Sequence, residues 1–138
     1  MGKPARLIID ADVNKRVATE LNGRGRPATA TSELELGRTK DEPLLRTLAA
    51  RLNDPQAWVL VTGDDAMPDD HPGALAELQI TLATIDPRRP EGSGEDAWRR
   101  DVVHRWAHAI QSQPAGTIRR YSATRHGLWK PRRRGKRR

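Results

Sequence analysis

Short apolar runs alternate along the chain with longer segments in which apolar residues return every three to four positions. Runs of the first kind predict buried strands, and segments of the second kind predict helices with one apolar face. The helical period is clearest where Leu44, Leu45, Leu48 and Leu52 share one face. The predicted strands are residues 6–9, 28–31, 58–62 and 80–85, and the predicted helices are residues 14–24, 40–53, 72–78 and 95–111.

The order of these segments indicates an α/β fold. Strands that alternate with helices are typical of βαβ units, which build a mainly parallel sheet with helices on its faces. We therefore expect one domain over residues 1–116, with a sheet of about four strands and a C-terminal helix at residues 95–111.

Composition excludes several classes of protein and site. The chain contains no Cys, which excludes disulfides, thiolate zinc sites and cysteine nucleophiles. No apolar run approaches the roughly 20 residues of a membrane-spanning helix. The run Leu7-Ile8-Ile9 is too short for the apolar core of a signal peptide. We therefore expect a cytoplasmic protein without a membrane partner.

Charge is distributed unevenly along the 138 residues, which carry 25 Lys and Arg, 18 Asp and Glu, and a net charge of +7. All acidic residues lie at or before Asp101, and residues 117–138 are rich in Arg and Lys. This asymmetry predicts a flexible basic tail that binds a polyanion, most simply nucleic acid, although a solubility tail without a binding role has the same composition. The candidate phosphate contacts are Arg119, Arg120, Arg125, Lys130, Arg132, Arg133 and Arg134, with Tyr121 and Trp129 as candidates for stacking on bases.

Carboxylates follow two of the predicted strands. Asp10 and Asp12 come after the first strand, and Asp64 and Asp65 come after the strand at residues 58–62. In open α/β sheets, sites form beyond the carboxyl ends of strands at the point where the strand order reverses. If the first strand is central, that point lies between these two strands. The bland alternatives are that Asp10 is a turn residue and that Asp12 caps the first helix.

A third acidic segment, Asp41-Glu42, opens the helix predicted at residues 40–53. By helical angle, Asp41 falls inside the apolar arc and points toward the sheet, whereas Glu42 falls at its edge. Thr39 and Glu42 have the spacing of a capping box. We therefore assign Asp41 to the site and Glu42 to the cap, the alternative being that Asp41 only complements the helix dipole.

Clustered carboxylates repel one another unless a cation lies among them. Hard oxygen ligands suit Mg²⁺ or Mn²⁺, and such an ion can activate water and offset charge on a phosphodiester during cleavage. The candidate catalytic residues from this reasoning are Asp10, Asp12, Asp41 and Asp64, and the candidate metal ligands are Asp10, Asp41, Asp64 and Asp65. The sequence thus favours a metal-dependent nuclease.

The segments Leu7-Ile8-Ile9-Asp10-Ala11-Asp12-Val13 and Val59-Leu60-Val61-Thr62-Gly63-Asp64-Asp65, with the Asp41-Glu42 helix start between them, resemble the PIN-like domain family. The likeness is to its short PIN-like branch and to VapC-type toxins, and it covers residues 5–86. It implies a three-layer α/β/α fold and a Mg²⁺- or Mn²⁺-dependent endoribonuclease that is the toxin of a toxin–antitoxin pair.

By the same resemblance, Asp10, Asp41 and Asp64 would be metal ligands, and Thr62 would orient the site. The implied partners are RNA, an antitoxin protein and a second copy of the chain. The chain departs from the family pattern at Ala11, where an acid is common, and at Ala66 and Met67, which replace the end of the later motif.

Two other functions fit parts of the pattern. A receiver-like phosphoacceptor domain would use Asp10 and Asp12 as its acidic pair and Asp64 as the acceptor, because Asp64-Asp65-Ala66-Met67-Pro68 matches that family's D-x-x-M-P motif. Lys130-Pro131 imitates its late K-P motif, but no strand is predicted before it. A non-catalytic nucleic-acid-binding module would use the basic tail alone.

Overall fold

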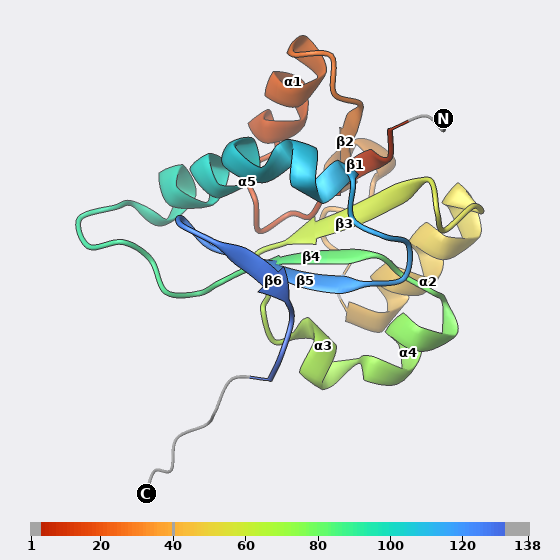
Figure 1. Ribbon diagram of the computed structural model, residues 1–138. Helices are drawn as coiled ribbons and strands as arrows, with labels where there is room; N and C mark the ends of the chain where they lie inside the picture. Colours follow the sequence, from red (N-terminus) through yellow and green to blue (C-terminus); the bar gives the residue numbers. More distant parts are fainter. Residues whose placement is uncertain (1–3, 40, 132–138) are drawn as a thin grey trace, which may run out of the picture.

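The computed structural model describes residues 4–39 and 41–131, except for the side chain of Asp41. Its centre is a six-stranded sheet in the order β2-β1-β3-β4-β5-β6 (Figure 1). The first five strands are parallel, and β6 runs antiparallel to β5. The strands are β1 (Arg6–Ile9), β2 (Ala28–Ala30), β3 (Trp58–Thr62), β4 (Leu82–Ile85), β5 (Ile118–Tyr121) and β6 (His126–Leu128). The expected α/β class and mainly parallel sheet are confirmed, whereas the expected number of strands is wrong.

Helices cover both faces of the sheet (Figure 1). On one face lie α1 (Arg16–Gly23) and α5 (Glu95–Gln111). On the other face lie α2 (Asp41–Leu52) and α4 (Pro72–Glu77), with the short α3 (Met67–Asp70) before α4. A 3-10 helix, Thr31–Leu34, follows β2. In the described part of the chain, no helix has the length and apolar character that a bilayer crossing requires.

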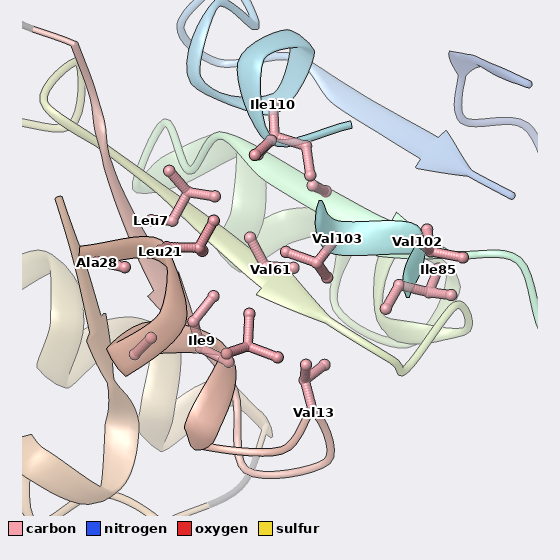
Figure 2. Packing of buried hydrophobic residues seen from close by; sticks show 14 of the residues in the cluster. Leu7, Ile9, Val13, Leu21, Ala28, Val61, Ile85, Val102, Val103 and Ile110 are labelled. Carbon is pink, nitrogen blue, oxygen red and sulfur yellow. The ribbon is translucent and has the colours of Figure 1, made fainter. Parts of the chain in front are cut away.

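The core lies on both faces of the sheet because the central strands are apolar at successive positions. In β1, Leu7 and Ile9 pack under α1 and α5, while Ile8 packs under α2 and α4. Figure 2 shows the first of these clusters, in which Val102 and Val103 of α5 meet the sheet. With no Phe in the chain, branched aliphatic side chains fill this core.

The sheet continues past the expected domain boundary at residue 116. Tyr121 of β5 is 1% exposed, and its hydroxyl donates a hydrogen bond of 2.9 Å to Gln113 Oε1. The backbone of β5 pairs with β4 over its whole length. Residues 118–128 are therefore part of the folded domain, and the prediction that a flexible tail begins at residue 117 is wrong for this segment.

The path of α5 brings a helix to the carboxyl end of β3. The chain passes from β3 through α4 to β4, and from β4 through α5 to β5, and both steps move toward the same edge of the sheet. Helix α4, however, lies on one face of the sheet and α5 on the other. Two such connections have opposite hands, so one of them departs from the strong preference for right-handed crossovers. Because α5 crosses the same face as α1, its first turns reach the loop after β3, where Arg99 lies over Gly63.

Candidate functional site

The strand order reverses between β1 and β3, as the sequence analysis expected for a central first strand. The backbone N–H of Asp10 donates to the carbonyl of Val61 at 2.9 Å, which aligns the carboxyl ends of the two strands. A cleft of 580 Å³ opens at this point. Its lining consists of Asp10, Ala11, Asp12, Gly37, Thr39, Leu44, Gly63, Asp64, Met67 and Arg99.

The hydroxyl of Thr62 links the acidic residues of this cleft. It donates to Asp10 Oδ2 at 2.8 Å, lies 3.4 Å from Asp12 Oδ2, and accepts the backbone N–H of Asp64 at 3.0 Å. Thr62 itself is fully buried, so these bonds form away from solvent. This hydroxyl thus orients the Asp10 carboxylate and the loop after β3 relative to each other.

Asp12 joins the two loops rather than capping α1. Its Oδ1 accepts the backbone N–H of Gly63 at 2.9 Å. The first turn of α1 instead uses Asn14, whose Oδ1 accepts the N–H of Arg16 at 2.8 Å. Asp64 accepts the N–H of Ala66 through Oδ1 at 3.0 Å, which holds its carboxylate at the start of the loop.

Burial, together with the nearby like charges, disfavours the ionised form of Asp10. Burial raises the pKa of Asp10 to about 6, and the nearby charges of Asp12 and Asp64 act in the same direction. The hydrogen bonds from Thr62 and from the N–H of Ala11 act against this rise. The ionised form of Asp10 is therefore disfavoured unless a positive charge lies near it.

Asp41 opens α2, as predicted, but its side chain lies outside the described residues. Among the side chains that the structure does describe, no three His, Asp or Glu residues are gathered as a ready-made metal site. The donor chemistry still suits a hard cation, because Asp10, Asp12 and Asp64 line one cleft and burial opposes the charge on Asp10.

Asp65 is held in an internal ion pair instead of joining the acidic cleft. Its side chain is 6% exposed. Arg120 donates to its two carboxylate oxygens at 2.8 Å each, and Thr84 Oγ1 donates at 2.8 Å. The indole N–H of Trp129 completes the set at 3.1 Å. The prediction that Asp65 is a metal ligand is thus at odds with the structure, because its oxygens are occupied by donors from β4, β5 and the segment after β6.

Sequence reasoning missed Arg99, which brings a positive charge to the rim of the acidic cleft. Its Nη1 donates to the carbonyl oxygen of Asp12 at 2.6 Å, and its Nη2 lies 3.4 Å from Glu95 Oε2. Its Nε is buried and has no hydrogen-bond partner among the described residues. The guanidinium packs so closely on Gly63 that a Cβ there would lie 2.8 Å from Arg99 Cζ.

The predicted cap at the start of α2 is wrong. The N–H of Thr39 donates to the carbonyl of Leu36 at 3.0 Å, so the Glu42 carboxylate is not its acceptor. Glu42 accepts instead from Arg46 Nε at 2.8 Å, one turn along the helix. Arg46 also bonds Glu77 of α4, so Glu42 belongs to a surface ion-pair group.

The basic residues predicted to bind nucleic acid have different surroundings. Arg120 is engaged by Asp65, and Arg119 Nη2 lies 3.1 Å from His126 Nδ1. Arg125 and Lys130 are exposed. Arg132, Arg133 and Arg134 lie outside the described residues. Of the predicted stacking residues, Tyr121 is buried and therefore cannot stack on a base, and Trp129 turns its N–H inward to Asp65.

Comparison of the chain with family models, curated proteins and solved structures finds no match. The case for a function therefore depends on the cleft and on the sequence motifs around it.

Proposed function

We propose that the chain is a metal-dependent endoribonuclease of the PIN-like class, with its active site in the cleft between β1 and β3. The observation that carries this proposal is the convergence of Asp10, Asp12 and Asp64 around the hydroxyl of Thr62. These are the residues of the two motifs that resemble the PIN-like family. Their position at the switch point of the sheet is where α/β proteins bind ligands.

The electrostatics of the cleft support a divalent cation as cofactor. Mg²⁺ or Mn²⁺ would be held by the carboxylates of Asp10, Asp12 and Asp64, with Asp41 as a further candidate at the start of α2. When bound, such an ion supplies an activated water and offsets charge on the phosphodiester. A cation would also stabilise the ionised form of Asp10, whose pKa is raised by burial and by the nearby charges of Asp12 and Asp64.

The protein groups around the acids have defined tasks in this proposal. Thr62 fixes the carboxylate of Asp10 through its 2.8 Å hydrogen bond, so that this side chain needs little reorganisation during the reaction. The Arg99 guanidinium at the rim is positioned to attract a phosphate and to stabilise negative charge that develops on it. The carboxylates alone would repel the phosphates of RNA, so the positive charge of Arg99 at the rim aids binding.

The proposal is tested by incubating the full chain with fluorescently labelled single-stranded RNA. We expect cleavage with Mg²⁺ or Mn²⁺ and none in excess EDTA, with activity restored when Mn²⁺ is added back. Cleavage that persists in EDTA would rule out this mechanism. RNA binding without cleavage under any of these conditions would favour a non-catalytic module.

Three further proposals follow from the PIN-like resemblance alone: the chain acts as a toxin, it binds an antitoxin protein, and it forms a homodimer. Expression of the chain in a bacterial host should then arrest growth, and Asp10→Asn should relieve the arrest. Growth that is unaffected by the wild-type chain at the same expression level would argue against the toxin role. The oligomeric state is measurable by light scattering.

A receiver-like phosphoacceptor domain is the second candidate. It is favoured by the parallel order β2-β1-β3-β4-β5, which is a common order of doubly wound sheets, with acids at the β1/β3 switch point. A fifth strand is present, contrary to the expectation from the sequence, but Lys130 follows β6 and not β5. Labelling of the chain by acetyl phosphate, lost in Asp64→Asn, would support this candidate over the nuclease.

A further inference from the structure

Two clefts lie at the carboxyl ends of β4 and β5, away from the acidic cleft. They have volumes of 220 and 400 Å³ and share Asp86, Arg88, Ser122 and Arg125 in their linings, so they form one continuous surface. The loop after β4 supplies one wall, and the turn between β5 and β6 supplies the other. We call this surface the basic cleft; its further lining residues are Arg89, Pro90, Arg120, Ala123, Thr124, His126, Gly127 and Leu128.

Positive charge is in excess in the basic cleft. Four arginines line it, and Asp86 is its single acidic lining residue within the described part of the chain. Asp86 is bonded by Arg88, and Arg120 is bonded by Asp65. Arg89 and Arg125 are exposed, and neither has an ion pair among the described residues. Both guanidinium groups are therefore available to an anionic ligand, and their charges give this surface a positive potential.

His126 lines the basic cleft beside the arginines. Burial lowers the pKa of His126, and the charge of Arg119 lowers it further. The imidazole is therefore neutral near pH 7 and stacks on Tyr121 with ring centroids 5.0 Å apart. It adds a flat polar surface to the wall of the cleft without adding charge.

The basic cleft and the acidic cleft open at the same edge of the sheet. Asp10, Asp64 and Asp86 each follow a strand, and these strands are parallel neighbours in the order β1-β3-β4. Neighbouring strands are about 4.8 Å apart, so two strand spacings, roughly 10 Å, separate β3 from β5. A nucleic-acid strand with the stacked helical rise of roughly 3.4 Å per nucleotide covers that distance with about three nucleotides.

We propose that the basic cleft binds the phosphate backbone of a single-stranded RNA and leads it into the acidic cleft. The identity of the polyanion as RNA rests on the proposed function. Guanidinium groups match phosphate oxygens with two parallel hydrogen bonds, and exposed Arg89 and Arg125 face the cleft from opposite walls. An acidic protein segment is a poorer fit, because the lining offers few apolar side chains to anchor one.

The test is a salt titration of RNA binding to the full chain in EDTA, which separates binding from cleavage. The probe is a short fluorescein-labelled single-stranded oligoribonucleotide, and binding is followed by anisotropy. The variant is Arg89→Gln/Arg125→Gln. Arg88 is left intact because it bonds the buried Asp86. The matched control is Arg6→Gln/Arg105→Gln, which removes the same charge from exposed positions at the start of β1 and on α5.

We expect the cleft variant to reduce the slope of log affinity against log salt by about 1.4, from roughly 0.7 per phosphate contact on a single strand. If the affinities at 1 M salt are equal, the affinity of the cleft variant near 50 mM salt should fall by about 60-fold, whereas the control should leave the slope unchanged. Equal slopes for wild type and the cleft variant would overturn the proposal, as would an equal loss in the control or the absence of RNA binding by the wild-type chain.

Polyglutamate serves as a second probe. If the cleft variant loses affinity for polyglutamate but not for RNA, the cleft binds an acidic protein segment and the RNA proposal fails. If RNA binding depends on the cleft as expected while the wild-type chain cleaves no RNA with Mn²⁺, the cleft inference stands and the nuclease proposal fails.

Discussion

Thr62 organises the acidic cleft because its single hydroxyl both donates and accepts. It donates to Asp10 and accepts from the N–H of Asp64, so the ends of β1 and β3 share one buried polar group. A hydroxyl costs free energy when it is buried without partners, and here both of its functions are satisfied. At the scale of the residue, the geometry of the site follows from this one side chain.

Asp10→Asn should change how stability depends on pH. Between the ordinary pKa of 3.8 and the raised pKa of about 6, the folded protein binds more protons at Asp10 than the unfolded chain does. This site therefore lowers the free energy of unfolding as pH rises through that window, by at most about 3 kcal/mol. The effect is absent below the window and complete above it.

The measurement is urea unfolding of the wild type and Asp10→Asn between pH 4 and pH 7 without metal. We expect Asp10→Asn to lack the fall in the free energy of unfolding that Asp10 causes as pH rises. The variant should therefore be the more stable of the two proteins at neutral pH. If the free energies of unfolding of the two proteins change equally over this range, the pKa of Asp10 is not raised in the folded state.

Gly63→Ala should affect substrate binding more than stability. The new Cβ would lie 2.8 Å from Arg99 Cζ, and the flexible guanidinium would have to move away from the rim of the cleft. The effect on the free energy of unfolding should stay within about 1 kcal/mol, because no apolar core group is lost. If Arg99 attracts the phosphate, the KM for RNA cleavage should rise severalfold. Gly73→Ala, where nothing lies within 4 Å of the new Cβ, is the control and should leave KM unchanged.

Most residues of the candidate site could be predicted because they follow strands directly. Asp10 and Asp64 come after apolar runs, and Thr62 ends such a run. Arg99 could not be predicted, because its place in the cleft depends on the face that α5 crosses, and local patterns do not specify that face. The prediction that Asp65 lies in the acidic cleft is wrong because adjacent side chains after a strand point in different directions. The side chain of Asp65 points toward β4 and β5.

At the scale of the element, β5 is attached to the sheet by an ion pair that no local pattern predicts. Its sequence, Ile118-Arg119-Arg120-Tyr121, has two adjacent charges and no clear alternation, so the local pattern predicts a tail. In the structure, Arg120 is neutralised by Asp65, and the hydroxyl of Tyr121 is satisfied by Gln113. The strand therefore forms through its backbone pairing with β4 and because Asp65, far away along the chain, satisfies the charge of Arg120.

Arg120→Gln should destabilise the fold strongly, because it leaves the buried carboxylate of Asp65 without its cation. Loss of one partner from a buried pair typically costs about 3–5 kcal/mol, and the remaining bonds from Thr84 and Trp129 favour the lower end. Arg119→Gln, next to it on β5, should cost less than about 1 kcal/mol because Arg119 has no carboxylate partner among the described residues.

Chemical denaturation of both variants measures the difference. A double-mutant cycle with Asp65→Asn gives the coupling between the two residues. Similar costs for the two arginine variants, or a coupling near zero, would show that this pair does not hold β5 in the sheet.

At the scale of the whole molecule, residues 118–128 complete a domain that the sequence divided in two. Up to residue 111, the four predicted strands and four predicted helices are present, and the last helix has the predicted bounds. The 3-10 helix Thr31–Leu34 and the short α3 are not predicted, because they are too short to show a regular apolar spacing. The last two strands lack that signal. They extend the sheet beyond β4, whose buried residues Leu82 and Ile85 would otherwise lie on an unpaired edge strand.

Truncation tests whether residues 118–128 belong to the folded domain or to a tail. A chain that ends at Pro131 should unfold cooperatively with a Tm within a few degrees of full length, because every described strand is retained. A chain that ends at Gly116 loses buried Tyr121 and the partner of β4, and its Tm should fall by more than about 10 °C or the transition should disappear. Circular dichroism on heating measures both. A full-length Tm for the chain that ends at Gly116 would contradict the six-stranded domain.

The most direct test of the account is cleavage of single-stranded RNA with Mn²⁺ by Asp10→Asn, Asp64→Asn and Asp69→Asn. Asp69 is an exposed acid on α3 outside the lining of the cleft, so its variant controls for loss of charge. We predict that Asp10→Asn and Asp64→Asn lose at least about a hundredfold in rate while each keeps a folded circular dichroism spectrum, and that Asp69→Asn cleaves like the wild type. Wild-type rates in Asp10→Asn and Asp64→Asn would contradict an active site between β1 and β3.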